Sequence, residues 1–120
     1  MIIFSIPFEV PSQNVCERRH WSARRKEQET LAILLRIHCP PFKRVTAQRL
    51  VSIRAYRKRK CRDLANLIGG CKGLVDALVT AGLLVDDSEK WARFEYAQDL
   101  ASVLKHKTPM TGITISEGKW

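Results

Sequence analysis

The chain has 120 residues, of which 45% are hydrophobic and 28% are charged. This composition is typical of one folded domain and excludes two domains or a disordered chain. The 21 Lys and Arg outnumber the 12 Asp and Glu, and the net charge of +9 favours a polyanionic partner. Because the basic residues cluster in loops and at element ends, nucleic acid is a better prediction than a membrane surface; the alternative is a basic protein without such a partner.

The first 14 residues predict a strand followed by a turn. Residues 2–8 alternate loosely, and Pro11, Ser12 and Asn14 supply turn and capping chemistry. The apolar start has no basic segment before it, contains a proline and a glutamate, and is too short to span a bilayer. We therefore expect a strand, not a signal or anchor, and a cytoplasmic protein.

A helix is predicted to follow this turn and to end near Cys39. Leu31, Leu34 and Leu35 recur at helical spacing, and two prolines directly after Cys39 prevent the helix from continuing. The four cysteines of the chain form neither a CxxC pair nor the Cys/His spacing of a zinc site. We expect free thiols and no zinc.

The second half of the chain alternates between strand and helix patterns. The expected elements are a strand over 46–56, a helix over 64–78, and strands over 92–98 and 111–116. Gly82 suits the position just after a helix C-terminus. This order indicates a single small α+β domain over residues 1–120, with two main helices packed on a mixed or antiparallel sheet.

Three acids near the second predicted helix suggest a metal site. Asp63 lies at a strand–helix junction, where a helix N-cap is the alternative role. Asp86 and Asp87 follow the helix, where adjacent carboxylates also suit a plain turn. A strand–helix junction and the loop returning from that helix can approach each other around a cation, and Mg²⁺ takes carboxylate, water and phosphate oxygens. With basic residues beside them, these acids predict phosphodiester hydrolysis.

Lys72 is a candidate for phosphate stabilisation, and the alternative is an exposed i,i+4 pair with Asp76. In one continuous helix Asp63 and Lys72 would lie on opposite faces, roughly 13 Å apart along the axis. They share a site only if the helix is interrupted. Two consecutive glycines lie between them, and each disfavours a helix by about 1 kcal/mol. We therefore expect a loop or kink at 68–70, with the regular helix beginning near Cys71.

Several motifs occur in the order found in one known family. The segments "RDLANL" at 62–67, "KGLVDAL" at 72–78 and "AGLLVDD" at 81–87 resemble the RusA-type Holliday-junction resolvases, whose pattern is roughly D-x-D-N-L, K-x-x-x-D-A-L and a closing D-D. The "VPSQN" turn at 10–14, followed by a basic segment with His and Trp, is similar to the N-terminal region of that family. The resemblance covers most of the chain.

The resemblance implies an endodeoxyribonuclease of DNA recombination and repair, bacterial or phage-encoded. Such enzymes are homodimers that bind four-way DNA junctions by structure and cut paired strands with Mg²⁺ or Mn²⁺, without a small-molecule cofactor. A C₂ dimer suits a nearly two-fold-symmetric substrate. The resemblance places the catalytic and metal-binding acids on Asp63 and Asp87, a further metal ligand on Asp86, and the essential lysine on Lys72.

One position departs from the family pattern. Ala65 stands where the pattern has its second Asp, and alanine cannot ligate a metal. Either Glu89 or another acid substitutes, or the metal binds weakly, or the chain binds branched or duplex DNA without efficient cleavage. An RNA-binding module is a third hypothesis, disfavoured because the aromatic residues are dispersed.

Two basic clusters are expected to contact DNA phosphates. Such contacts give affinity and salt dependence and carry no sequence information directly. The alternative is that both clusters are solvated ends of strands and helices. The first cluster comprises Arg57, Lys58, Arg59, Lys60 and Arg62, and the second comprises Arg18, Arg19, Arg24 and Arg25.

Overall fold

Alternating apolar side chains give the sheet of this protein one buried face. The computed structural model describes residues 1–13 and 20–120, and its strands are β1 (Ile2–Ile6), β2 (Arg49–Arg57), β3 (Ala92–Leu100) and β4 (Met110–Glu117). In β2, Val51, Ile53 and Ala55 are buried, while the residues between them are more exposed. This is the period of two expected when one face is covered and the other meets solvent.

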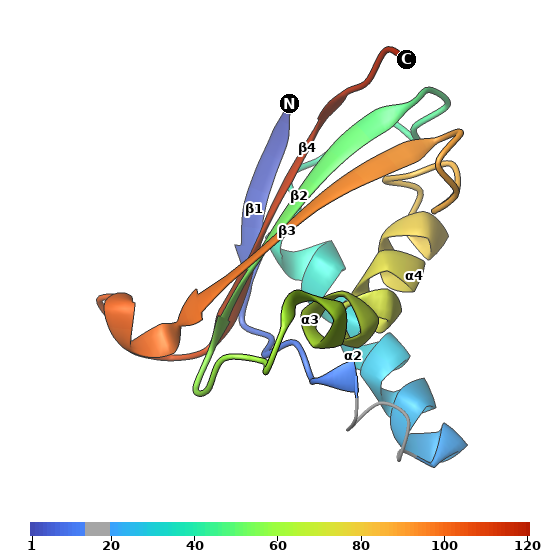
Figure 1. Ribbon diagram of the computed structural model, residues 1–120. Helices are drawn as coiled ribbons and strands as arrows, with labels where there is room; N and C mark the ends of the chain where they lie inside the picture. The colour runs from blue at the N-terminus through green and yellow to red at the C-terminus, as the bar shows by residue number, and fades with distance from the viewer. Residues whose placement is uncertain (14–19) are drawn as a thin grey trace.

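The four strands form one mixed sheet in the order β1-β4-β2-β3 (Figure 1). β4 pairs antiparallel with both β1 and β2, whereas β2 pairs parallel with β3. A parallel pair cannot be joined by a hairpin, so the chain between β2 and β3 must cross over the sheet. Two helices, α3 (Leu64–Gly70) and α4 (Lys72–Thr80), form this crossover.

The helices cover one face of the sheet and complete the core. α2 (Trp21–His38) packs beside α4, and the short 3₁₀ helix η1 (Ala101–Val103) follows β3 (Figure 1). The prediction of a single α+β domain with a mixed sheet is confirmed. Across the described residues, no helix is long and apolar enough to cross a membrane. The helical side chains buried against the sheet include Leu31, Leu35, Leu67, Leu74 and Leu78.

The predicted elements are confirmed, with their ends shifted by a few residues. α2 ends at His38 with Cys39 as its C-cap, as the two following prolines predict. Gly82 follows α4 with a φ of 86°, and the N–H groups of Gly82 and Leu83 donate to the carbonyls of Val79 and Leu78, both at 3.0 Å. This is the Schellman arrangement that favours glycine.

The helix interruption was predicted at the wrong residues. Residues 68–70 belong to α3, and the break lies at Cys71, whose φ of −81° and ψ of −8° separate α3 from α4. The regular helix does begin near Cys71, as expected. Gly70 serves close packing instead of breaking the helix, because a Cβ there would lie 1.7 Å from the carbonyl oxygen of Pro11. Tertiary contact therefore explains a glycine that propensity alone assigned to a kink.

We predict that Gly70→Ala destabilises the fold by at least about 2 kcal/mol, because its methyl group would displace the backbone at Pro11. Gly69→Ala is the matched control, since a Cβ there meets only the flexible side chain of Gln13. Its cost should stay below about 1 kcal/mol, because alanine is the better helix former. Urea unfolding of both variants measures the difference, and equal midpoints would contradict the packing role of Gly70.

Candidate functional site

Asp63 lies where the basic loop after β2 turns into α3. Its backbone is extended (φ −151°, ψ 174°), and its Oδ1 accepts a hydrogen bond of 2.8 Å from the backbone N–H of Asn66. This bond satisfies one of the free amides in the first helical turn. The N-cap alternative is therefore confirmed. A carboxylate has about four lone-pair sites, and the capping bond uses one of them, on Oδ1. The other lone pairs of the exposed carboxylate can still bind a cation.

Asp86 lies in the exposed turn between α4 and β3 and is held within that turn. The backbone N–H of Asp87 and the hydroxyl of Ser88 donate to its carboxylate, and these bonds lower the pKa of Asp86 below its ordinary value. The local bonds are those of a turn-forming aspartate. The turn alternative is therefore confirmed for Asp86, whose charge is stabilised by its own neighbours.

Asp87 lies close enough to β3 to influence a tyrosine on the helix-covered face. The pKa of Tyr96 is raised to about 12. Burial is the largest cause, and the nearby Cys71 thiol and Asp87 carboxylate also contribute. Negative charge near a phenol favours its neutral form. Cys71, at the break between the crossover helices, and Asp87 therefore share one neighbourhood on β3.

Gln98, the next residue on the same face of β3, holds the loop that carries Asp63. Its Oε1 accepts from the backbone N–H of Cys61 at 2.7 Å, and its Nε2 donates to the Cys61 carbonyl at 3.2 Å. Asp63 is near enough to Cys61 to influence the pKa of the thiol, which burial chiefly raises. Tyr96 and Gln98 are roughly 7 Å apart along the strand. Asp63 and Asp87 are therefore linked to β3 at two positions on one face, Asp63 through the loop that Gln98 holds and Asp87 through Tyr96.

The predicted metal ligands do not form a complete group. Within residues 1–13 and 20–120, no three His, Cys, Asp or Glu side chains are placed to hold one metal ion. Mg²⁺ is often bound by only one or two carboxylates, with water and substrate phosphate completing its shell. The metal site at Asp63 and Asp87 therefore stays a prediction.

Ala65 and Lys72 lie at the starts of the two crossover helices. Ala65 is exposed in the first turn of α3, two residues after Asp63, and its methyl group offers no ligand. Lys72 is the exposed first residue of α4. In the described part of the chain no ion pair joins Lys72 to Asp76. The break at Cys71 separates Lys72 from α3. The placement of Asp63 and Lys72 on opposite faces, expected for one continuous helix, therefore does not apply.

Glu27 of α2 is an acid beside this region that the sequence did not single out. A Cβ on Gly73 would lie 2.4 Å from Oε1 of Glu27, so the carboxylate lies against the first turn of α4. The adjacent Gln28 donates from Nε2 to the Gly73 carbonyl at 2.7 Å. Both residues belong to a polar stretch of α2, which from sequence alone resembles a solvated helix face.

The first basic cluster contains one structural arginine and an exposed group. The half-buried Arg57 donates from Nε to the Val10 carbonyl at 2.7 Å and from its guanidinium to the Arg59 carbonyl. The backbone N–H of Lys58 donates to Glu9 Oε2 at 2.7 Å. These bonds fix the loop against the segment that follows β1. The cations that remain exposed are Lys58, Arg59, Lys60 and Arg62.

The second basic cluster is only partly described by the structure. Arg18 and Arg19 lie outside the described residues. Arg24 and Arg25 are exposed in the first turns of α2, and Nε of Arg25 lies 3.5 Å from Oε1 of Glu29. This pair is too exposed to contribute much stability.

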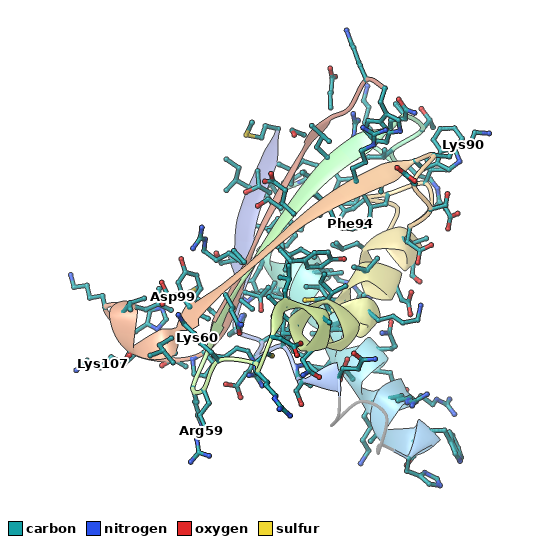
Figure 2. The ribbon with its side chains drawn as sticks, in the orientation of Figure 1. Arg59, Lys60, Lys90, Phe94, Asp99 and Lys107 are labelled. Atoms are coloured by element: carbon teal, nitrogen blue, oxygen red, sulfur yellow. The ribbon has the colours of Figure 1, made fainter. Side chains whose placement is uncertain are left out.

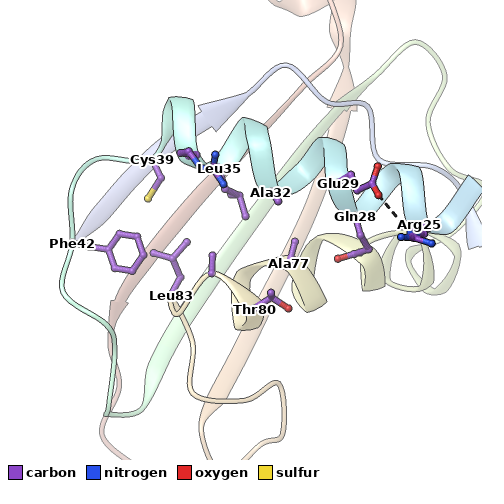
Figure 3. A pocket seen from close by; sticks show the side chains of 12 residues that line it. Arg25, Gln28, Glu29, Ala32, Leu35, Cys39, Phe42, Ala77, Thr80 and Leu83 are labelled. Atoms are coloured by element: carbon purple, nitrogen blue, oxygen red, sulfur yellow. Dashed lines mark ion pairs between the residues drawn. The ribbon is translucent and has the colours of Figure 1, made fainter.

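A groove of about 610 Å³ lies between α2 and α4, with the Arg25–Glu29 ion pair at one end (Figure 3). Its walls are largely apolar and include Leu35, Phe42 and Leu83. None of the predicted acids lines it. The acids and the exposed cations of the first cluster therefore define the candidate site, and the groove is a separate feature.

Comparisons with known proteins add no family to these observations. A scan against protein-family models finds no match, and a search of curated proteins finds none. The RusA resemblance therefore rests on the sequence motifs alone.

We predict that Asp63→Asn leaves the free energy of unfolding within about 0.5 kcal/mol of the parent, because Asn is as good an N-cap as Asp. Asp63→Ala should lose about 1 kcal/mol, since it removes the acceptor for the Asn66 N–H. Urea unfolding of both variants measures the cap separately from the carboxylate charge. Identical midpoints for the two variants would contradict the capping role.

We also predict that Asp87→Asn lowers the pKa of Tyr96, because it removes a negative charge that favours the neutral phenol. Asp86→Asn is the matched control and should leave that pKa unchanged. The measurement is the ultraviolet titration of tyrosinate at alkaline pH, with Tyr96→Phe identifying the relevant transition. Because the folded pKa of about 12 exceeds the ordinary value of 10.0 for a tyrosine, the free energy of unfolding should fall as the pH rises between these two values. An unshifted Tyr96 titration in Asp87→Asn would remove Asp87 from this neighbourhood.

Proposed function

We propose that the protein is a Mg²⁺-dependent, structure-selective endodeoxyribonuclease that resolves four-way DNA junctions, as its resemblance to RusA implies. The position of Asp63 supports this proposal most strongly. Its carboxylate is exposed at the end of the loop that presents Arg59, Lys60 and Arg62 to solvent. A backbone held by these cations would lie beside a carboxylate able to bind a metal, which is the pairing that metal-assisted phosphodiester hydrolysis requires.

The proposed roles follow from the position of each side chain. The exposed cations of the first cluster hold backbone phosphates, with Arg57 fixing the loop that carries them. Asp63 and Asp87, with Asp86 beside them, would hold Mg²⁺ or Mn²⁺. When bound, the metal supplies an activated water and stabilises charge on the phosphate. Lys72, exposed at the start of α4, would neutralise charge on the phosphate or the leaving oxygen.

We include in this proposal a homodimer that acts in the cytoplasm of a bacterial cell. A C₂ dimer presents two equivalent sites, and a four-way junction is nearly two-fold symmetric. Each site of the dimer would then cut one of two equivalent strands of the junction. The partners are then branched DNA and a second copy of the chain.

A second candidate function is binding of branched or duplex DNA without efficient cleavage. Ala65 favours this alternative, because it places a methyl group at the position of the second Asp in the RusA pattern. Glu89, an exposed acid two residues after Asp87, is a candidate to replace the missing ligand. The Glu89 carbonyl accepts from Nε1 of Trp120 at 3.0 Å, which fixes the backbone of that turn.

We predict Mg²⁺-dependent, symmetric nicks when the protein is mixed with a synthetic four-way junction, and none in EDTA. Ala65→Asp should increase the rate by at least about tenfold, because a second carboxylate in the first turn of α3 adds a metal ligand. Ala47→Asp, which adds the same charge at an exposed position before β2, is the matched control and should leave the rate unchanged. Gel analysis of junctions labelled on each strand measures both the rate and the symmetry.

The outcomes separate the two candidate functions. Binding without nicks by the parent, with nicks appearing only in Ala65→Asp, would establish the binding protein with one lost ligand. Binding with no nicks from either chain would contradict the nuclease. A parent chain that neither binds nor cuts the junction would overturn both candidates.

A further inference from the structure

A second basic turn lies at the same end of the sheet as the loop that follows β2. Arg57, the last residue of β2, pairs with Leu100, the last residue of β3, and Tyr56 pairs with Met110, the first residue of β4. The loop after β2 and the connection from β3 to β4 therefore leave the sheet at one end. Figure 2 shows Arg59, Lys60 and Lys107 at that end.

The two connections are joined by side-chain hydrogen bonds. Gln98, three residues before η1, makes both of its amide bonds to the backbone of Cys61, at 2.7 and 3.2 Å. The loop after β2 is therefore fixed to β3 where that strand approaches the second connection. Because β3 and β4 flank β2, two strand spacings, roughly 10 Å, separate the points where the connection leaves and re-enters the sheet.

The second turn has a defined shape. Lys107 has a φ of 52°, and its N–H donates to the Leu104 carbonyl at 3.1 Å. The backbone N–H of Thr108 donates to Nδ1 of His106, and the Thr108 hydroxyl donates to the His106 carbonyl, both at 3.1 Å. A left-handed conformation is uncommon for a residue with a side chain, so these bonds hold Lys107 in an orientation that an unconstrained loop would seldom adopt.

The side chains of the turn are positive or hydrogen-bond donors, and all are exposed. Within the described chain, Lys105, His106 and Lys107 form no ion pair. Because Nδ1 of His106 accepts a hydrogen bond, its neutral ring carries the proton on Nε2 and offers a donor there. Two ammonium groups and one N–H donor in a fixed turn suit the non-bridging oxygens of phosphates.

We propose that Lys105, His106 and Lys107 form a second phosphate-binding arm, and that a nucleic-acid backbone lies across the end of the sheet between this arm and the loop that carries Arg59 and Lys60. The inference rests on the proposed function and deepens it by naming the second contact to the phosphodiester backbone.

The test is binding of a fluorescent four-way junction in EDTA, measured by anisotropy at salt concentrations from about 50 to 300 mM. The slope of log affinity against log salt counts the phosphate contacts, at about 0.9 per contact for duplex DNA. A Lys105→Gln and Lys107→Gln double variant should lower this slope by about 1.8 and weaken binding at least about tenfold at low salt. Lys119→Gln, an exposed charge loss beyond the other end of β4, should change neither quantity beyond the general effect of net charge.

Lys107→Gly separates the charge from the shape of the turn. Glycine readily adopts the positive φ of this position, so this variant keeps the turn while it removes one ammonium group. The proposal expects the slope to fall by about 0.9. A slope equal to that of the parent would mean that the turn is only structural, and would overturn the arm.

The outcomes distinguish the arm from the proposed function. An unchanged slope in the turn variants, with a reduced slope in an Arg59→Gln and Lys60→Gln double variant, would overturn the second arm alone. A parent chain that does not bind the junction at any salt concentration would overturn the proposed function, and the arm with it. Binding to vesicles of anionic lipid as tight as to the junction would also overturn the arm as a nucleic-acid contact.

Discussion

Because β2 and β3 pair in parallel, the chain between them has to return across the sheet before β3 can begin. α3 and α4 make that return, so the loop carrying Asp63 leaves one end of the sheet and the turn carrying Asp87 enters at the other. The same pairing brings the ends of β2 and β3 together. One topological constraint therefore places the loop after β2 and the turn after β3, with their cations, at the same end of the sheet. Asp63 and Asp87 approach β3 from opposite ends.

The crossover is held in place by contacts with the segment that follows β1. Gly70 brings α3 against the backbone of Pro11, and the guanidinium of Arg57 binds the carbonyl of Val10. These two contacts lie on either side of Asp63 in the sequence, and the two bonds between Gln98 and Cys61 add a third attachment. Asp63 is consequently positioned by a frame of backbone contacts that does not depend on a metal ion.

The sequence predicted the elements well because strand alternation, helical spacing and a glycine such as Gly82 are local signals of burial and turn geometry. It misplaced the helix break, because propensity treats Gly70 as unfavourable to a helix, whereas the close contact with Pro11 requires a residue without a side chain. The sequence also grouped Arg57 with the exposed cations, because composition cannot show that the guanidinium of Arg57 donates to the carbonyls of Val10 and Arg59. The basic segment around Lys107 was visible in the sequence, but only strand register places it beside the loop after β2.

The two candidate functions differ at one exposed position and not in the fold. The hydrogen bonds that shape the basic end come from Gln98, Arg57 and Glu9, none of which belongs to the predicted metal ligands. A methyl group in place of a carboxylate at Ala65 leaves those bonds unchanged, because the side chain points away from the core. Affinity for a phosphate backbone depends on the cations, whereas the rate of hydrolysis depends on ligands that stabilise the transition state. Substitution at this one position can therefore change the proposed rate of hydrolysis while the fold and the exposed basic surface stay the same.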